Sequence, residues 1–129
     1  MRTSRAALPY LEKSRGSIIN ISSTAALKPS PRNPPYGAVK AALVQYTLSQ
    51  AAQHAAKFIR VNCIAPGSIE FPGGSWERRK TTDPKLYNTV LSRCRFGRLG
   101  TPDEVANVAL FLASSAASCT TPSRCCWRT

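Results

Sequence analysis

Acidic residues are scarce in this chain of 129 residues. It has 6 Asp or Glu against 18 Lys or Arg, so its formal net charge is +12. Excess cationic side chains attract polyanions, but here they are spread along the chain, and the run Arg78-Arg79-Lys80 is short. This distribution favours a solvated basic face over a nucleic-acid tail. We therefore expect no nucleic-acid partner, and a basic nucleic-acid binder is the weakest functional alternative.

Long apolar runs are absent as well. No stretch approaches the roughly 20 apolar residues that a membrane-spanning helix needs, and the first nine residues contain no apolar signal-peptide region. We therefore expect a cytoplasmic protein with no membrane partner. Apolar residues still make up 43% of the chain, which is enough for the modest core of one compact domain.

The cysteines lack the spacing of a metal site. There are five, with no CxxC pair among them, so we expect no metal, and the odd count favours reduced thiols. Three of them fall in the last eleven residues, where helical and strand periodicity both stop. We therefore expect residues 119–129 to be a divergent, disordered tail, and translation in a shifted frame is one hypothesis for its origin.

Glycine and proline divide the rest of the chain into elements. Residues 17–22 form a short β-branched run typical of a buried parallel strand. Residues 23–35 contain four prolines and predict a loop, whereas residues 36–56 contain no proline and predict a long helix. Residues 58–65 predict a second strand, which ends at Pro66-Gly67. Together these segments predict a βαβ unit with parallel strands.

Two further segments follow. Residues 70–100 are basic, aromatic and interrupted by Gly and Pro, and they predict a flap with one short helix near 84–93. Thr101, followed by Pro102 and two acids, is a typical helix start and predicts a helix over residues 102–114.

Tyr36 and Lys40 are candidates for acid–base chemistry. They stand four residues apart at the start of the predicted long helix, so their side chains share one face. An ammonium beside a phenol stabilises the phenolate and makes the phenol a better proton carrier. The spacing alone is a weak signal, because a packed Tyr beside a surface Lys gives the same pattern.

Ser22, Ser23 and Pro66-Gly67 close the two predicted strands. The carboxyl ends of parallel strands meet at one sheet edge, where ligands bind in open α/β sheets. The alternatives are that the serines cap backbone groups of the loop and that Pro-Gly is only a turn.

The order and spacing of these motifs resemble the short-chain dehydrogenase/reductase family. The resemblance covers about residues 15–118 and rests on four segments: Asn20-Ile-Ser-Ser23, Tyr36-Gly-Ala-Val-Lys40, Val61-Asn-Cys-Ile-Ala-Pro-Gly-Ser-Ile-Glu70 and Arg98-Leu-Gly-Thr-Pro-Asp-Glu-Val-Ala106. It implies an α/β fold, a partial Rossmann-like three-layer domain with a doubly wound parallel sheet. Residues 1–118 would be the carboxyl-terminal half of that domain, without the amino-terminal dinucleotide-binding half.

The resemblance also implies a reaction. The family transfers hydride between the nicotinamide of NAD or NADP and a small-molecule carbonyl or alcohol substrate. Tyr36 would be the general acid/base, Ser23 would hydrogen-bond the same substrate oxygen, and Lys40 would assist Tyr36 and bind the nicotinamide ribose. The backbone of the Pro-Gly loop would hold the nicotinamide carboxamide. The implied cofactor-binding residues are Tyr36, Lys40, Pro66, Gly67 and Ile69.

The chain departs from the family at several points. It has no GxxxGxG motif for the pyrophosphate, the upstream catalytic asparagine is missing, and Phe71 stands where a Thr often binds the cofactor. The alternative to an active oxidoreductase is therefore a truncated, catalytically inactive fragment that acts at most as an interaction partner. Helix 36–56 carries small and apolar residues on more than one face, so we expect a homo-oligomer through this helix.

Overall fold

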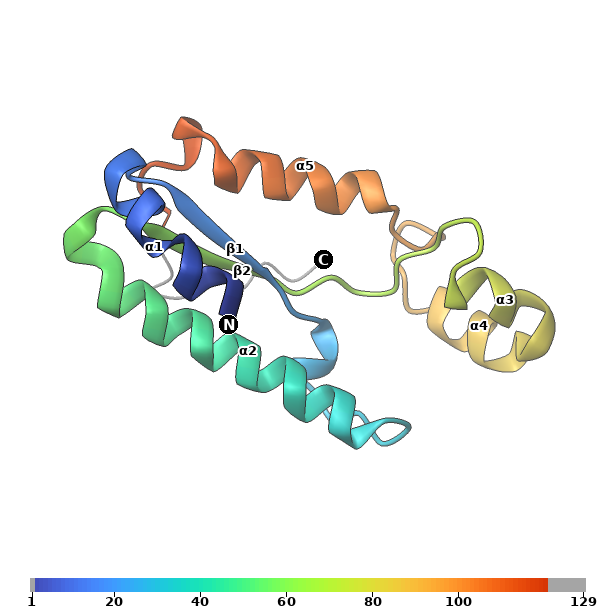
Figure 1. Cartoon of the computed structure of the whole chain (residues 1–129). Coiled ribbons are helices and arrows are strands. Elements are labelled where there is room, and N and C mark those ends of the chain that lie inside the picture. The colour runs from blue at the N-terminus through green and yellow to red at the C-terminus, as the bar shows by residue number, and fades with distance from the viewer. Residues whose placement is uncertain (1, 121–129) are drawn as a thin grey trace.

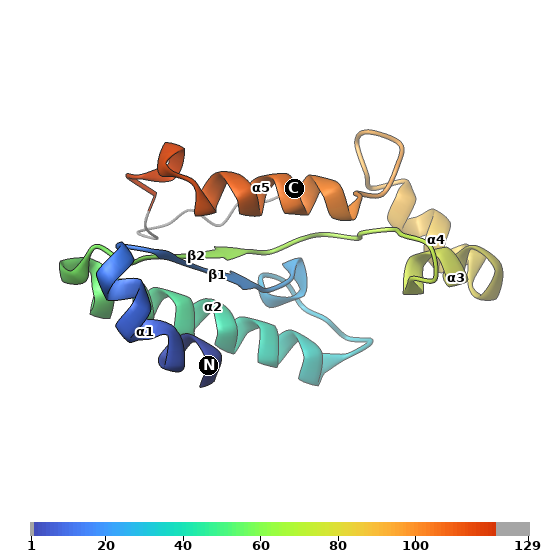
Figure 2. The ribbon, with the colours of Figure 1, turned by 45° about the horizontal axis from the view of Figure 1, so that its top comes forward.

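A two-stranded parallel sheet lies between two layers of helices (Figure 1). The computed structural model describes residues 2–120. In chain order, its helices and strands are α1 (Arg2–Ser14), β1 (Ser17–Ile21), α2 (Pro34–His54), β2 (Arg60–Ile64), α3 (Ser75–Thr82), α4 (Pro84–Leu91) and α5 (Pro102–Ala113). Helices α1 and α2 cover one face of the sheet and α5 covers the other (Figure 2). This arrangement confirms the predicted α/β, Rossmann-like class with three layers.

The two strands pair in parallel register, and β2 is more deeply buried between the helices than β1. Ser17 lies opposite Arg60, and the register continues to Ile21 opposite Ile64. On one face, Ile18 packs with Ala51, Ile59 and Val61, and α1 adds Leu8 and Leu11. On the other face, Ile64 packs with Leu112 of α5 and with Ala117. Packing of helices on both faces explains why both strands read as apolar runs rather than as alternating patterns.

Helix α2 begins two residues earlier than predicted, at Pro34. Asn33 caps it, because its side-chain oxygen accepts a hydrogen bond from the Tyr36 amide at 3.2 Å. Proline is tolerated in the first helical turn, where no amide is needed for the ladder, so Pro34 and Pro35 belong to the helix. The helix ends at His54 and continues as a short 3-10 helix over Ala55–Lys57.

The face of α2 toward the sheet is more polar than the sequence suggested. Its buried residues are Gly37, Thr47, Gln50, Ala51 and His54. Thr47 is satisfied there, because it accepts a hydrogen bond from Asn20 at 2.9 Å and donates one to the Leu43 carbonyl at 2.8 Å. Val39, an apolar residue of α2, is 68% exposed. In this chain the sheet covers one side of α2.

The flap contains two helices where one was predicted. Helix α4 matches the predicted segment but ends at Leu91. Helix α3 was missed because its residues, Ser75–Thr82, are mostly charged and polar and follow Gly73-Gly74. Its first turn is stabilised by Glu77, whose carboxylate accepts a hydrogen bond from the Gly73 amide at 2.6 Å. Both helices lie together beyond the carboxyl ends of the strands, at one end of the molecule (Figures 1 and 2).

Helix α5 has the predicted start and a well-satisfied end. Thr101 and Glu104 form a capping box. At the other end, the Arg60 guanidinium donates to the carbonyls of Leu112, Ala113, Ser114 and Ala117 at 2.5 to 3.2 Å. Because Arg60 starts β2, this contact fastens α5 to the sheet.

Most of the predicted tail, residues 121–129, lies outside the described residues. Within residues 2–120, none of the helices has both the length and the apolar character that crossing a membrane requires.

Candidate active site

Lys40 joins α2 to the carboxyl end of β1. Its ammonium donates a hydrogen bond to the Ile21 carbonyl at 2.9 Å, and its own carbonyl accepts one from the Ser22 hydroxyl at 2.8 Å. The ammonium also lies 5.7 Å from the centre of the Tyr36 ring. An ammonium has three donors, so two remain after the bond to Ile21. The structure therefore brings the predicted pair together at the predicted edge of the sheet.

Tyr36 lies in the first turn of α2 and is 43% exposed. Its position depends on a close approach of two backbones at the next residue. A Cβ at Gly37 would lie 3.1 Å from the Ala25 carbonyl oxygen and 3.1 Å from the Ser30 Cβ. Both contacts would be tighter than is usual for a Cβ, so a larger residue at position 37 would push the loop after β1 away from α2 by a few tenths of an ångström. The loop and the helix thereby present the Tyr36 ring at the sheet edge.

Ser23 caps a short 3-10 helix over Thr24–Ala26. Its hydroxyl oxygen accepts a hydrogen bond from the Ala25 amide at 3.2 Å. This is the capping role that was the alternative to a substrate contact. A hydroxyl that accepts from an amide can still donate its own proton. The cap therefore fixes the oxygen beside the strand end and leaves Ser23 its donor.

The loop after β2 is hydrogen-bonded to the end of β1. The Ser22 amide donates to the Ile64 carbonyl at 2.7 Å, and the Thr24 amide donates to the Pro66 carbonyl at 3.0 Å. The ends of the two strands are therefore held at one edge, together with Lys40. The structure thus brings Ser23, Lys40 and Pro66 to this edge, as the sequence predicted.

Ile69 lies further along the same loop and pairs with Gly100 in an isolated parallel bridge. The Gly100 amide donates to the Ser68 carbonyl at 3.0 Å, and the Glu70 amide donates to the Gly100 carbonyl at 2.8 Å. These bonds use neither the amide nor the carbonyl of Ile69. Gly67, between Pro66 and this bridge, is half-buried. The bridge therefore joins the two ends of the flap, residues 70–100. It lies beside the loop of residues 66–69, which the sequence predicts to bind the cofactor.

Sequence reasoning missed a cluster of ionisable groups next to that bridge. The Glu70 carboxylate forms an ion pair with Lys80 of α3 and accepts a hydrogen bond from the Tyr87 hydroxyl of α4 at 2.9 Å. Lys80 lowers the pKa of Glu70, and Glu70 raises the pKa of Lys80. Burial and the Glu70 carboxylate together raise the pKa of Tyr87. No local spacing signals this cluster, because its members lie ten and seven residues apart on different elements.

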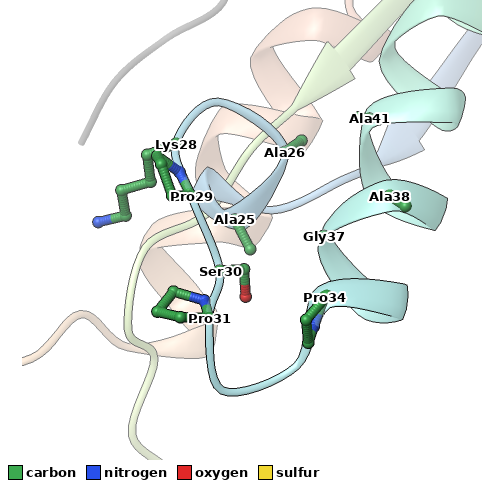
Figure 3. A pocket seen from close by; sticks show the side chains of 10 residues that line it. All are labelled: Ala25, Ala26, Lys28, Pro29, Ser30, Pro31, Pro34, Gly37, Ala38 and Ala41. Atoms are coloured by element: carbon green, nitrogen blue, oxygen red, sulfur yellow. The ribbon is translucent and has the colours of Figure 1, made fainter.

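A separate cavity lies on another side of α2. It has a volume of about 370 Å³ and is formed between the loop after β1 and the first turns of the helix (Figure 3). Its lining is Ala25, Ala26, Lys28, Pro29, Ser30, Pro31, Pro34, Gly37, Ala38 and Ala41. Tyr36 and Lys40 do not line it, so the cavity is distinct from the candidate site. Across residues 2–120, no three His, Cys, Asp or Glu side chains gather where they could hold a metal ion.

Comparison with known proteins adds a family match. A family model described as enoyl-(acyl carrier protein) reductase matches residues 1–126. Isoepoxydon dehydrogenase patN of Aspergillus clavatus is 43% identical over 116 residues, which are 88% of this chain and 45% of that protein. The chain thus spans about half the length of the curated relatives that it matches.

Solved structures agree with this match. An oxidoreductase of the short chain dehydrogenase/reductase family from Burkholderia thailandensis superposes with a TM-score of 0.81 at 32% identity, over 92% of this chain and 46% of that one. A 3-oxoacyl-[acyl-carrier protein] reductase with bound NAD from Brucella melitensis superposes with a TM-score of 0.73 at 35% identity, over 92% and 42%.

Proposed function

Because the chain belongs to the short-chain dehydrogenase/reductase family, we propose that it carries the acid–base half of an NAD(P)-dependent oxidoreductase. The reaction is hydride transfer between a nicotinamide and a small-molecule carbonyl or alcohol. The observation that carries the proposal is the position of Lys40, whose ammonium bonds the end of β1 at 2.9 Å and lies 5.7 Å from the Tyr36 ring. Residues 1–118 serve as one half of a Rossmann-like domain in this proposal.

Each candidate residue takes a role that its position supports. Tyr36 passes a proton to or from the substrate oxygen, since its ring is exposed at the sheet edge. Ser23 donates a hydrogen bond to the same oxygen while the Ala25 amide holds its hydroxyl in place. Lys40 assists Tyr36 from its position 5.7 Å from the centre of the ring.

The residues at this edge also fit a nicotinamide cofactor, either NAD or NADP. Lys40 has two donors left for ribose hydroxyls, and the bridge at the flap base leaves both polar backbone groups of Ile69 for a carboxamide. Pro66 and Gly67 complete this loop, and the Tyr36 hydroxyl adds a contact to the ribose. When bound, the cofactor supplies or accepts the hydride. The relative with bound NAD supports this assignment.

The second candidate is a catalytically inactive fragment that acts as an interaction partner. Exposed apolar residues favour it, such as Val39 at 68% and Leu110 at 69%. The exposed apolar residues of α2, Val39 and Leu48 among them, also support a homo-oligomer through this helix.

A cofactor titration separates the two candidates. We expect the purified chain to bind NADH or NADPH, seen as a change in nicotinamide fluorescence. Lys40→Met should weaken this binding about tenfold or more, because a charged hydrogen-bond donor is lost. Lys13→Met, which removes an exposed lysine of α1, is the matched control and should change nothing. Absence of binding at about 1 mM cofactor, the upper end of ordinary enzyme affinities, would favour the inactive fragment.

A further inference from the structure

The flap helices contain no buried residue of their own. None of the residues of α3 or α4 is fully buried, although the two helices contact each other. Helices in globular proteins are usually held by an apolar face packed on a core. The orientation of this helix pair relative to the sheet edge therefore depends more on polar contacts than the orientation of α2 or α5 does.

One carboxylate makes such contacts to both flap helices. Glu70 pairs with Lys80 of α3 and accepts from the Tyr87 hydroxyl of α4 at 2.9 Å. The Lys80 ammonium also lies 5.6 Å from the centre of the Tyr87 ring. The Glu70 side chain is only 22% exposed, so water covers it far less than an ordinary surface carboxylate. An isolated surface ion pair contributes little, but here a single, largely covered acceptor connects three segments.

The backbone of Glu70 is fixed at the base of the flap. Its amide donates to the Gly100 carbonyl at 2.8 Å, next to the bridge between Ile69 and Gly100. The backbone of Glu70 therefore belongs to the contacts with Gly100 that join the two ends of the flap, and its side chain contacts both flap helices. This residue connects the loop before it to both α3 and α4.

We propose that Glu70 is a positioning residue, which with Lys80 and Tyr87 sets the orientation of α3 and α4 relative to the loop formed by residues 66–69. The cluster holds the flap in place, and occupation of the loop by a nicotinamide strengthens that hold. The second part rests on the proposed function, because it requires that the loop bind the cofactor. The cluster thus contributes to substrate selection and takes no part in the proton transfer.

The first test uses the chain without cofactor. Glu70→Gln keeps an acceptor for Tyr87 but removes the charge that pairs with Lys80, and Glu70→Ala removes both. We expect trypsin to cleave after Arg78 and Arg79 several-fold faster in the Gln variant and faster still in the Ala variant. Lys85→Gln, which removes an exposed charge of α4, is the control and should leave these two rates unchanged.

Two results would overturn the positioning role. One is unchanged cleavage after Arg78 and Arg79 in both Glu70 variants. The other is a fall in the urea midpoint of the whole chain in step with the faster cleavage, because Glu70 would then support the fold in general.

The second test adds NADH. In the wild-type chain, NADH should slow cleavage of the flap, and Glu70→Gln should bind NADH equally well but lose this protection. The ketone is the one that the wild type reduces fastest in a substrate panel. With it, Glu70→Gln should have a several-fold higher KM and an unchanged kcat. Equal protection in both proteins would refute the coupling. If NADH does not bind at all, the proposed function fails, and the cofactor-free cleavage rates still decide the positioning role.

Discussion

The sheet edge and the flap are held by different kinds of interaction. At the sheet edge, the Ser22 amide and the Lys40 ammonium donate hydrogen bonds to the last carbonyls of β2 and β1, at 2.7 and 2.9 Å. The Thr24 amide donates to the loop after β2 at 3.0 Å. These strands lie in the core, where Val61 is completely buried. In the flap, α3 and α4 contain no buried residue, and the cluster of Glu70, Lys80 and Tyr87 connects them to the flap base.

This difference matches the demands of the proposed reaction. A group that transfers a proton must stay within hydrogen-bond reach of the reacting oxygen, and side chains on rigid elements hold such geometry best. A segment that selects the substrate tolerates adjustment, and mobile segments often carry specificity. We therefore place proton transfer at the sheet edge and substrate selection in the flap.

The sharpest test of this division is Tyr36→Phe. We expect turnover to fall about 10²- to 10⁴-fold, the usual contribution of acid–base catalysis, with NADH affinity nearly unchanged. Tyr10→Phe, which alters a tyrosine that is 74% exposed on α1, is the control and should retain full turnover. The measurement is steady-state NADH oxidation beside a fluorescence titration. Retained turnover in Tyr36→Phe would refute the acid–base role of Tyr36. An equally large loss of kcat in a flap variant such as Glu70→Gln would refute the division of roles between the sheet edge and the flap.

The same contrast explains how much the sequence could predict. The strands, α2 and α5 follow from local signals: β-branched runs, alanine-rich helical periodicity and the Thr101 cap with its proline and acids. Ser23, Tyr36, Lys40 and Pro66 could be placed at one edge because parallel strands end together. The early start of α2 at Pro34 depends on the Asn33 cap, a side-chain hydrogen bond that helical periodicity does not mark.

The flap was less predictable for a physical reason. Helix α3 has a charged sequence with no apolar stripe, so no hydrophobic period marks it. Glu70, Lys80 and Tyr87 come together only through the fold of the flap, and residues so placed show no spacing rule. Interactions between partly exposed side chains of distant segments leave little trace in one sequence.

A smaller effect on stability should separate the regions further. Ile59→Ala creates a cavity beside β2, where Ile59 is 1% exposed, and should cost about 2 to 5 kcal/mol in the free energy of unfolding. Leu86→Ala, in the half-buried face of α4, should cost about 1 kcal/mol or less. Urea titrations followed by circular dichroism measure both. Equal losses would show that the flap is packed as part of the core.

The smallest predicted effect concerns acid. Arg98, together with the Thr101 amide, holds the pKa of Glu104 at about 2, below its ordinary value of 4.5. A carboxyl whose pKa is lower in the folded state contributes stability above the unfolded value, and this contribution is lost as the pH falls through the folded value. Stability from Glu104 is therefore present above pH 4.5 and decreases between pH 4.5 and about 2.

Glu70 also has a lowered pKa, because of Lys80, but it lies in the flap, whereas Glu104 starts the helix that places Leu112 in the core. Only Glu104 should therefore affect global unfolding. We expect Glu104→Gln to flatten the acid dependence of the urea midpoint below pH 4.5, and Glu70→Gln to leave it as in the wild type. Since the Arg98–Glu104 pair is half-exposed, the change should be small. If Glu70→Gln flattened the acid dependence and Glu104→Gln did not, the flap would unfold together with the core.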